Sequence, residues 1–189
     1  MKERHYSVLL VSATDNFVEA VRPMLPSGQF DVKRTTGSND ARRESAQNNY
    51  DFIIINSVNR TENDIDFATD ACTGPGCVVL VFVKNESYYP VYERVCEHGV
   101  FVLPKPFTKQ AFNNAIMWMV SARERLRRTE KKTFSLENRM EEIRLINRAK
   151  WALINTRGMD EPGAHRYIEK QAMDRCISKA AVAAEIIHG

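Results

Sequence analysis

The feature that most constrains this sequence is a stretch with no glycine and no proline, from Thr108 to Arg157. Glycine and proline are the residues that most disfavour a helix interior, so their absence permits one helix longer than a compact domain normally uses. Residues recur along it at the seven-residue spacing of a coiled coil. We expect a two-stranded coiled coil rather than a single helix packed on its own domain, because the helix outruns anything that one domain could cover.

The predicted seam of this coiled coil follows two sets of positions, each with a seven-residue repeat. The first set is Leu126, Thr133, Met140 and Asn147, and the second is Thr129, Leu136, Ile143 and Lys150. The seam is weak at its N-terminal end and better around 136–143. A polar residue such as Asn147 at a core position costs stability but fixes register and a two-stranded state. The residues that we assign to dimerisation are Leu126, Leu136, Met140, Ile143 and Asn147.

Short apolar runs alternate with helical segments in the first part of the chain. The segment 38–49 is predicted to be a polar helix that opens on Ser38 as its capping residue, and 15–25 is predicted to be an amphipathic helix. Runs that are apolar on nearly every residue suit central parallel strands covered on both faces. The pattern predicts a doubly wound, flavodoxin-like α/β domain with a five-stranded parallel sheet. The expected strands are 6–12, 30–34, 51–57, 77–83 and 99–104.

Two shorter helices are predicted after the long one. Asp160 is the expected N-cap of the first, with Pro162 in its first turn, and Ser178 is the expected cap of the second. The apolar face of the first comprises Ala164, Ile168, Ala172 and Met173. Together with the end of the long helix, the two short helices are expected to form a three-helix bundle.

The composition excludes several classes of protein. The hydrophobic fraction of 43% and the charged fraction of 27% are those of a folded globular chain rather than a disordered one. No apolar run is long enough to span a bilayer, and the N-terminal run is expected to be a strand rather than a signal peptide. No CxxC pair occurs, so we expect reduced thiols in a cytoplasmic protein, with no metal and no cofactor. The cysteines are Cys72, Cys77, Cys96 and Cys176.

The net positive charge of the chain comes from residues 121–189. Residues 1–120 hold 12 Lys+Arg against 14 Asp+Glu, whereas residues 121–189 hold 15 against 10. Basic charge concentrated at one end of a chain is typical of contact with a polyanion, although exposed helices also carry such charge for solubility alone.

Two segments of the first part resemble the receiver domain of bacterial response regulators. "HGVFVLPKPF" is similar to the fifth strand of that family and its Lys-Pro pair, here Lys105 and Pro106, and "YDFIIIN" is similar to its third strand. The resemblance implies a site in which an acidic pair holds Mg²⁺, an aspartate accepts a phosphoryl group and a Ser or Thr lies nearby.

This sequence departs from the receiver pattern at nearly every reactive position. Ser12 and Ala13 replace the acidic pair, Asn56 replaces the phosphoacceptor, and Phe82 or Val83 replaces the hydroxyl residue. Only Lys105 remains, and we expect it to contact Asn56. Asp15 lies close to the lost acidic pair, and Asp51 begins the third strand, far from the reactive edge. We expect a pseudo-receiver with no catalytic residue. The positions of the degenerate phosphorylation site are Ser12, Ala13, Asn56, Phe82 and Lys105.

The C-terminal part closely resembles the ANTAR domain, the RNA-binding module of transcription antitermination regulators. The matching features are "RAK" at 148–150, "GMDEPGAHRYI" at 158–168 and "QAMDR" at 171–175. Trp151 stands where the family usually has glycine; its ring either packs against a neighbouring helix, which we favour, or adds a stacking surface. The domains implied are 1–120, a pseudo-receiver; 121–135, a coiled-coil linker helix; and 136–189, an ANTAR domain.

The arrangement most resembles the antiterminator type of amidase operons. That resemblance implies a homodimer that binds tandem hairpins in leader mRNA and prevents formation of a terminator, and a receiver that docks a ligand-sensing regulatory protein. Hairpin loops offer unstacked bases to aromatic and guanidinium groups. The residues predicted to bind RNA are Arg148, Lys150, Arg157, His165, Arg166, Tyr167, Lys170 and Arg175.

Three other interpretations remain open at this point. A DNA-binding response regulator would need a recognition helix, but "KAAVAAEIIHG" is poor in side chains that read bases. An enzyme with a working phosphoacceptor is disfavoured by Ser12, Ala13 and Asn56. A scaffold that only dimerises would be indifferent to loss of the basic side chains.

Overall fold

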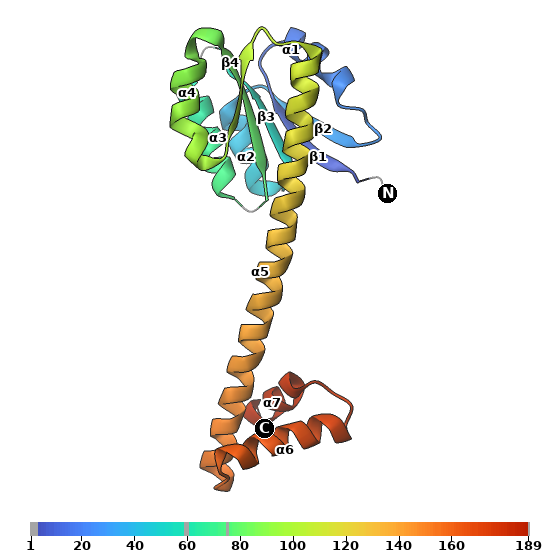
Figure 1. Cartoon of the computed structure of the whole chain (residues 1–189), viewed down its shortest axis with the longest axis vertical. Helices are drawn as coiled ribbons and strands as arrows, with labels where there is room; N and C mark the ends of the chain where they lie inside the picture. The colour runs from blue at the N-terminus through green and yellow to red at the C-terminus, as the bar shows by residue number, and fades with distance from the viewer. Residues whose placement is uncertain (1–3, 59–60, 75, 189) are drawn as a thin grey trace. The chain divides into compact units, whose positions relative to one another are not determined.

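The computed structural model describes residues 4–58, 61–74 and 76–188, and the chain divides into two compact units, Met1–Glu130 and Lys131–Gly189. Helix α5, Lys109–Arg157, is a single helix of 49 residues that contributes to both units (Figure 1). The prediction of one long helix is therefore confirmed. No helix in the described residues is both long enough and apolar enough to cross a membrane.

The first unit contains the predicted five-stranded parallel sheet. Its strands follow the order β2-β1-β3-β4-β5, with every neighbouring pair parallel. The order reverses between β1 and β3, as in the flavodoxin-like arrangement. The strands are β1 (Tyr6–Val11), β2 (Phe30–Thr35), β3 (Phe52–Asn56), β4 (Val78–Lys84) and β5 (Phe101–Lys105).

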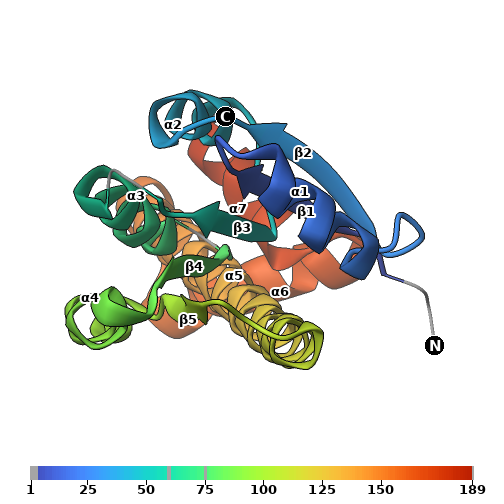
Figure 2. The same ribbon diagram turned by 90° about the horizontal axis from the view of Figure 1, so that it is seen from above.

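Helices cover both faces of this sheet. Helix α1 and the first turns of α5 lie on one face, and α2, α3 and α4 lie on the other (Figure 2). The central strands β3 and β4 are apolar toward both layers, which explains their unbroken apolar runs. The helices of this unit besides α5 are α1 (Asp15–Val21), α2 (Ser38–Gln47), α3 (Thr61–Thr73) and α4 (Tyr88–Val95).

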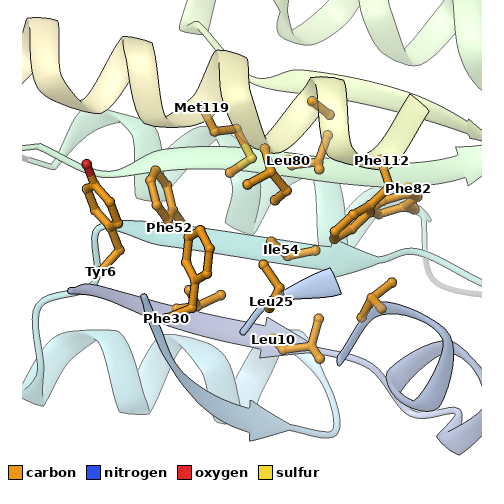
Figure 3. Close-up of a cluster of buried hydrophobic side chains, with 14 of the residues drawn as sticks. Tyr6, Leu10, Leu25, Phe30, Phe52, Ile54, Leu80, Phe82, Phe112 and Met119 are labelled. Carbon is orange, nitrogen blue, oxygen red and sulfur yellow. The ribbon is translucent and has the colours of Figure 1, made fainter. Parts of the chain in front are cut away.

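The core on the α1 and α5 face is rich in aromatic rings. Phe82 and Phe112 stack with ring centroids 6.0 Å apart, and the ring centroids of Tyr6 and Phe52 are 5.1 Å apart (Figure 3). Met119 of α5 is fully buried in the same cluster. The start of α5 is therefore part of the sheet domain and closes one of its faces.

Two local predictions in this unit were wrong. The helix expected to reach residue 25 ends at Val21 and tightens into a 3₁₀ turn, Arg22–Met24, because Pro23 has no N–H to donate within an α-helix. Ser38 is not the cap of α2; Gly37 holds that position. The Ser38 side chain is buried and its hydroxyl donates to Asp64 of α3.

The second unit is the predicted three-helix bundle. The end of α5 packs with α6 (Glu161–Asp174) and α7 (Lys179–His188). Both predicted caps are confirmed: Asp160 Oδ1 accepts from the Gly163 N–H at 2.8 Å, and Ser178 Oγ accepts from the Ala181 N–H at 3.1 Å. The buried core consists of Ala149, Leu153, Ala164, Ile168, Ala172, Val182 and Ala183.

Two residues expected to pack in this bundle are exposed instead. Met173 is 77% exposed, because the buried face of α6 runs through Ala164, Ile168 and Ala172, and residue 173 lies about 100° further round the helix. Trp151 is 65% exposed, because it lies on the opposite side of α5 from the buried Leu153. The prediction that Met173 packs in the bundle was wrong, and Trp151 does not pack against a helix of its own bundle.

Salt bridges connect α5 to the amino-terminal edge of the sheet. Asp51 precedes β3, and its carboxylate accepts from Arg123 Nε at 2.8 Å, from Arg127 Nη2 at 3.0 Å and from the Ser7 N–H at 3.1 Å. Burial alone would raise the pKa of Asp51. The hydrogen bonds from Arg123 and Ser7 and the two guanidinium charges outweigh burial and hold the pKa below its ordinary value.

Replacing this carboxylate should destabilise the first unit. Asp51→Asn leaves two guanidinium groups without their shared anion, so the free energy of unfolding should fall by roughly 2 kcal/mol. Because the native pKa is depressed, the contribution is present above the ordinary Asp pKa of about 4 and is lost as pH falls through the native pKa. Urea unfolding at neutral and acidic pH checks this. Asp31→Asn, at an exposed position, is the matched control, and equal losses in both variants would contradict the prediction.

Candidate functional site

The carboxyl-terminal edge of the sheet brings together the degenerate phosphorylation positions. Lys105 Nζ donates to Asn56 Oδ1 at 2.7 Å and to the Ser57 carbonyl at 2.8 Å. Asn56 Nδ2 donates to Ser12 Oγ at 3.1 Å and to Thr14 Oγ1 at 3.0 Å. The expected contact between Lys105 and Asn56 is therefore present, and the amide of Asn56 links the ends of β1, β3 and β5.

The charged groups near Asn56 do not form an acidic pair. Asp15, the first residue of α1, lies close to the lost acidic pair, as the sequence suggested, but it pairs with Arg34 at 2.6 Å. Arg34 also donates to the Ser12 carbonyl at 3.2 Å. Burial, and then the charge of Lys84, lower the pKa of Lys105 from its ordinary value.

The end of β4 offers no hydroxyl to this site. Phe82 is fully buried (Figure 3). Its ring centroid lies 4.7 Å from that of Phe107 and 4.9 Å from that of Phe17. Val83 is buried on the other face of the sheet. Asp51, considered as a substitute acceptor, lies at the opposite end of β3 and is held by arginines.

These residues do not fit a magnesium site. Mg²⁺ requires oxygen ligands, normally one or two carboxylates, in octahedral geometry. Here a methyl group, a hydroxyl and an amide stand at Ala13, Ser12 and Asn56. Within the described ranges, no group of three or more His, Cys, Asp and Glu side chains could hold a metal ion. The polar atoms of the site are engaged with one another, and the amide at its centre is not a competent nucleophile.

The basic side chains of the second unit fall into two groups, those with a carboxylate partner and those without. Lys150 belongs to the first group: its Nζ lies 2.9 Å from Glu161 Oε1, and only 16% of its side chain is exposed. Arg175 also belongs there, because both its terminal nitrogens reach Glu185, at 2.6 and 2.7 Å. Glu185 raises the pKa of Arg175, and Arg175 lowers the pKa of Glu185.

His165 shares its carboxylate with another cation. His165 Nε2 lies 3.3 Å from Glu169 Oε1, and Lys179 of α7 donates to the same oxygen. Lys179 is the main cause that lowers the pKa of Glu169. Sequence reasoning placed Lys179 at the start of the last helix but did not foresee this link, because it depends on how α6 and α7 pack.

Arg157 and Tyr167 form a preorganised pair. The Arg157 guanidinium lies over the Tyr167 ring at 5.1 Å from its centroid, and its Nη1 donates to the tyrosine hydroxyl at 2.9 Å. The contact joins the last turn of α5 to α6. A guanidinium held on an aromatic face still presents donors to a nucleic acid.

Arg166 and Lys170 are the cations of α6 that the bundle leaves available. Both are exposed, and neither has a carboxylate partner in the described part of the chain. Arg166 donates only to the Pro162 carbonyl, at 3.3 Å. The two residues are four apart and share one helix face with the exposed Met173. Arg148 of α5 is likewise exposed and without an acidic partner among the described residues.

The geometry of the first unit predicts that the chain does not accept phosphate at residue 56. After exposure to a small phosphodonor with Mg²⁺, intact-mass spectrometry should show no added phosphoryl group. Asn56→Asp alone should not restore it, because no acidic pair stands after β1 to hold the metal. A receiver domain with the full acidic site serves as the positive control. A stable phosphoryl adduct on the wild-type chain would refute this.

The second unit matches a known domain family, and the whole chain has curated relatives. Residues 135–187 match the ANTAR domain. Over 169 residues the chain is 27% identical to "Transcriptional regulatory protein PdtaR" of Mycobacterium tuberculosis, a match that covers 87% of this chain and 80% of that protein. The same protein from a second strain, H37Rv, matches equally.

Solved structures resemble the first unit. The crystal structure of an adenylate cyclase from Rhodopirellula baltica has a TM-score of 0.60 at 18% identity, and the match covers 68% of this chain and 97% of that one. The receiver domain of an HD domain-containing protein from Pseudomonas fluorescens has a TM-score of 0.58 at 13% identity, and the match covers 68% of this chain and 95% of that one. A response regulator receiver domain protein from Clostridium thermocellum has a TM-score of 0.56 at 16% identity, and the match covers 64% of this chain and 98% of that one.

At these identities the solved structures establish the fold alone. The receiver fold is thus common to the first unit and to its structural neighbours, whatever each of them does. The prediction of an ANTAR domain is confirmed by the family match, whereas the amidase-operon type stays a prediction. The chain therefore joins a domain of the receiver fold to a C-terminal segment that matches the ANTAR domain.

Proposed function

We propose that this chain is an RNA-binding transcription antitermination regulator. It binds hairpins in a leader transcript and prevents an overlapping terminator from forming, without making or breaking a covalent bond. The observation that carries the proposal is the ANTAR match over 135–187. In it, Arg166 and Lys170 are exposed, without acidic partners among the described residues, near the paired Arg157 and Tyr167. Guanidinium and aromatic groups receive unstacked loop bases, and lysine holds phosphate.

Two identical units acting together suit a target with two hairpins. The exposed apolar residues of α5 supply a surface for dimerisation, so that one dimer presents two bundles. The second contact then becomes intramolecular, and avidity favours tandem hairpins over a single one. The relative from M. tuberculosis, which is named a transcriptional regulatory protein, supports a role in transcription.

The receiver fold serves in this proposal as a docking surface rather than a phosphoryl switch. Asn56 and its hydrogen-bonded neighbours support this part, because they leave no acceptor carboxylate or metal ligand set. A ligand-sensing protein that binds this domain would control the regulator, as in the amidase-operon type. The proposal places the chain in the cytoplasm, with the transcripts that it would bind.

Removal of the two available α6 cations should weaken RNA binding. For an RNA with two short adjacent hairpins, the double variant Arg166→Ala, Lys170→Ala should raise Kd by about tenfold or more. It should also make the salt dependence of binding shallower, because phosphate contacts are lost. Filter binding or fluorescence anisotropy over a series of salt concentrations measures both effects.

The matched control removes one lysine and one arginine from α5 instead of α6. Lys131→Ala, Arg139→Ala alters two exposed side chains of the stretch before the bundle and should leave Kd nearly unchanged. Equal losses in both double variants would mean non-specific attraction to a basic surface. Preference for duplex DNA of equal length would favour a DNA-binding response regulator instead, and failure to prefer the double hairpin over a single one would remove the avidity argument.

A further inference from the structure

Trp151 is exposed, although it belongs to the part of α5 that packs in the bundle. Trp151 is 65% exposed, although Ala149 and Leu153 on either side of it are buried in the bundle core. At about 100° per residue, Trp151 lies on the far side of α5 from both. An indole is the largest apolar group in proteins, and leaving it in water forgoes the stabilisation that its burial would bring.

Trp151 continues a stripe of exposed apolar side chains along α5. Leu136, Met140 and Ile143 are 60%, 55% and 59% exposed. These three, Asn147 and Trp151 fall within an arc of about 80° around the helix axis. The stripe is the pattern of a helix that packs against another helix, and nothing in the described part of this unit covers it.

The middle of the stripe points to a second copy of the chain as its occupant. Asn147 interrupts the apolar residues, and against an unrelated apolar helix its amide would lose its hydrogen bonds to water. In a parallel, in-register pair it lies opposite Asn147 of the second copy, where each amide can donate to the other.

The charged flanking residues give one favourable and one unfavourable pair in the same orientation. In a parallel pair, Lys132 of one copy lies across from Glu137 of the other, and the charges are complementary. Arg139 then lies across from Arg144; this like-charge pair opposes the arrangement, and Glu141 lies 3.9 Å from Arg144 within the same helix. In the next seven-residue repeat, the residues at these flanking positions are apolar.

That apolar pair includes the tryptophan. Ile146 and Trp151 have the spacing of residues that face each other across a parallel coiled coil. Ile146 is half-buried, packed against the bundle core of its own chain. An indole resting on this residue from the other copy would cover the edge of the bundle as well as the seam.

We propose that Trp151 packs against Ile146 of a second, parallel copy and extends the dimer seam beyond Asn147 into the RNA-binding unit. The inference rests on the dimer in the proposed function. It goes further by fixing the orientation and register of the pair and by assigning the indole to a protein contact rather than to a base of the RNA.

Cysteine cross-linking tests the orientation and register. Asn147→Cys is introduced into the full chain with the exposed Cys96 and Cys176 changed to serine. Two thiols that face each other across a parallel, in-register seam are close enough for a disulfide, so oxidation should give a covalent dimer. Asn138→Cys is the matched control, because residue 138 lies on the opposite side of α5 and should cross-link far less. A dimer that cross-links equally at both positions, or at neither, would overturn the register.

Fluorescence tests the tryptophan itself. In the full chain with Trp118→Phe, Trp151 is the sole tryptophan, and its emission should shift to shorter wavelength as protein concentration rises through the dimer range. Trp151→Ala should raise the dimer Kd by about tenfold or more. Phe134→Ala, which removes an aromatic side chain that is 66% exposed but outside the stripe, should leave that Kd unchanged.

The outcomes separate this inference from the function on which it rests. A chain that is monomeric at every concentration would overturn both the inference and the dimer in the proposed function. A stable dimer whose Trp151 emission ignores protein concentration and is quenched by hairpin RNA would overturn the inference alone and make Trp151 a base-stacking residue. Circular dichroism of each variant shows whether the helices are intact, so a change in Kd is not mistaken for unfolding.

Discussion

Helix α5 is the constraint on which both units depend, because each unit needs a different part of it to close its core. A parallel sheet is stable only when both faces are covered. On one face of this sheet, much of the cover comes from Phe112, Ile116 and Met119 near the start of α5. At the other end, Ala149 and Leu153 supply one side of the bundle core. Neither domain is complete without its share of the helix.

Between these two anchored ends, α5 has no cover of its own. Every residue from 131 to 144 is exposed, and that segment includes Phe134, Leu136, Met140 and Ile143. A helix in water depends mostly on packing of an apolar face for its stability, since backbone propensity alone is marginal over such lengths. The exposed stretch therefore gives a physical reason for a second helix beside it, independent of any resemblance to other regulators.

Much of this architecture could be predicted from the sequence, because the strongest signals are periodic. Apolar runs predicted β1, β3, β4 and β5, and the mixed segment 30–34 predicted β2. The lack of glycine and proline predicted α5, and Asp160 and Ser178 predicted the starts of the last two helices. The errors arose where a single position depends on tertiary contacts. Ser38 looks like a cap in sequence, but its hydroxyl is used by Asp64 of another helix.

The candidate site was less predictable, and for the same reason. Sequence identifies which side chains are basic, but it does not say which of them a carboxylate from another helix engages. Lys150 and Lys170 were both predicted to bind RNA, but Lys150 pairs with Glu161, whereas Lys170 has no acidic partner in the described structure. Trp151 and Met173 were expected to pack because large apolar residues usually do. Their exposure follows from their positions around their helices, since Met173 lies about 100° from Ala172 and Trp151 lies on the opposite side of α5 from Leu153.

The loss of the phosphoacceptor also determines how such a protein can be switched. An aspartate at residue 56 could accept from Lys105, but it could not donate to Ser12 and Thr14 as the Asn56 amide does. The amide therefore satisfies the hydrogen-bonding groups of Ser12, Thr14 and Lys105 without metal or phosphate. Under the proposed function, such a domain responds to what binds it, and a partner shifts its state only by the difference in affinity for two states. Control of the proposed regulator would then depend on binding equilibria, at the receiver surface and along the exposed face of α5.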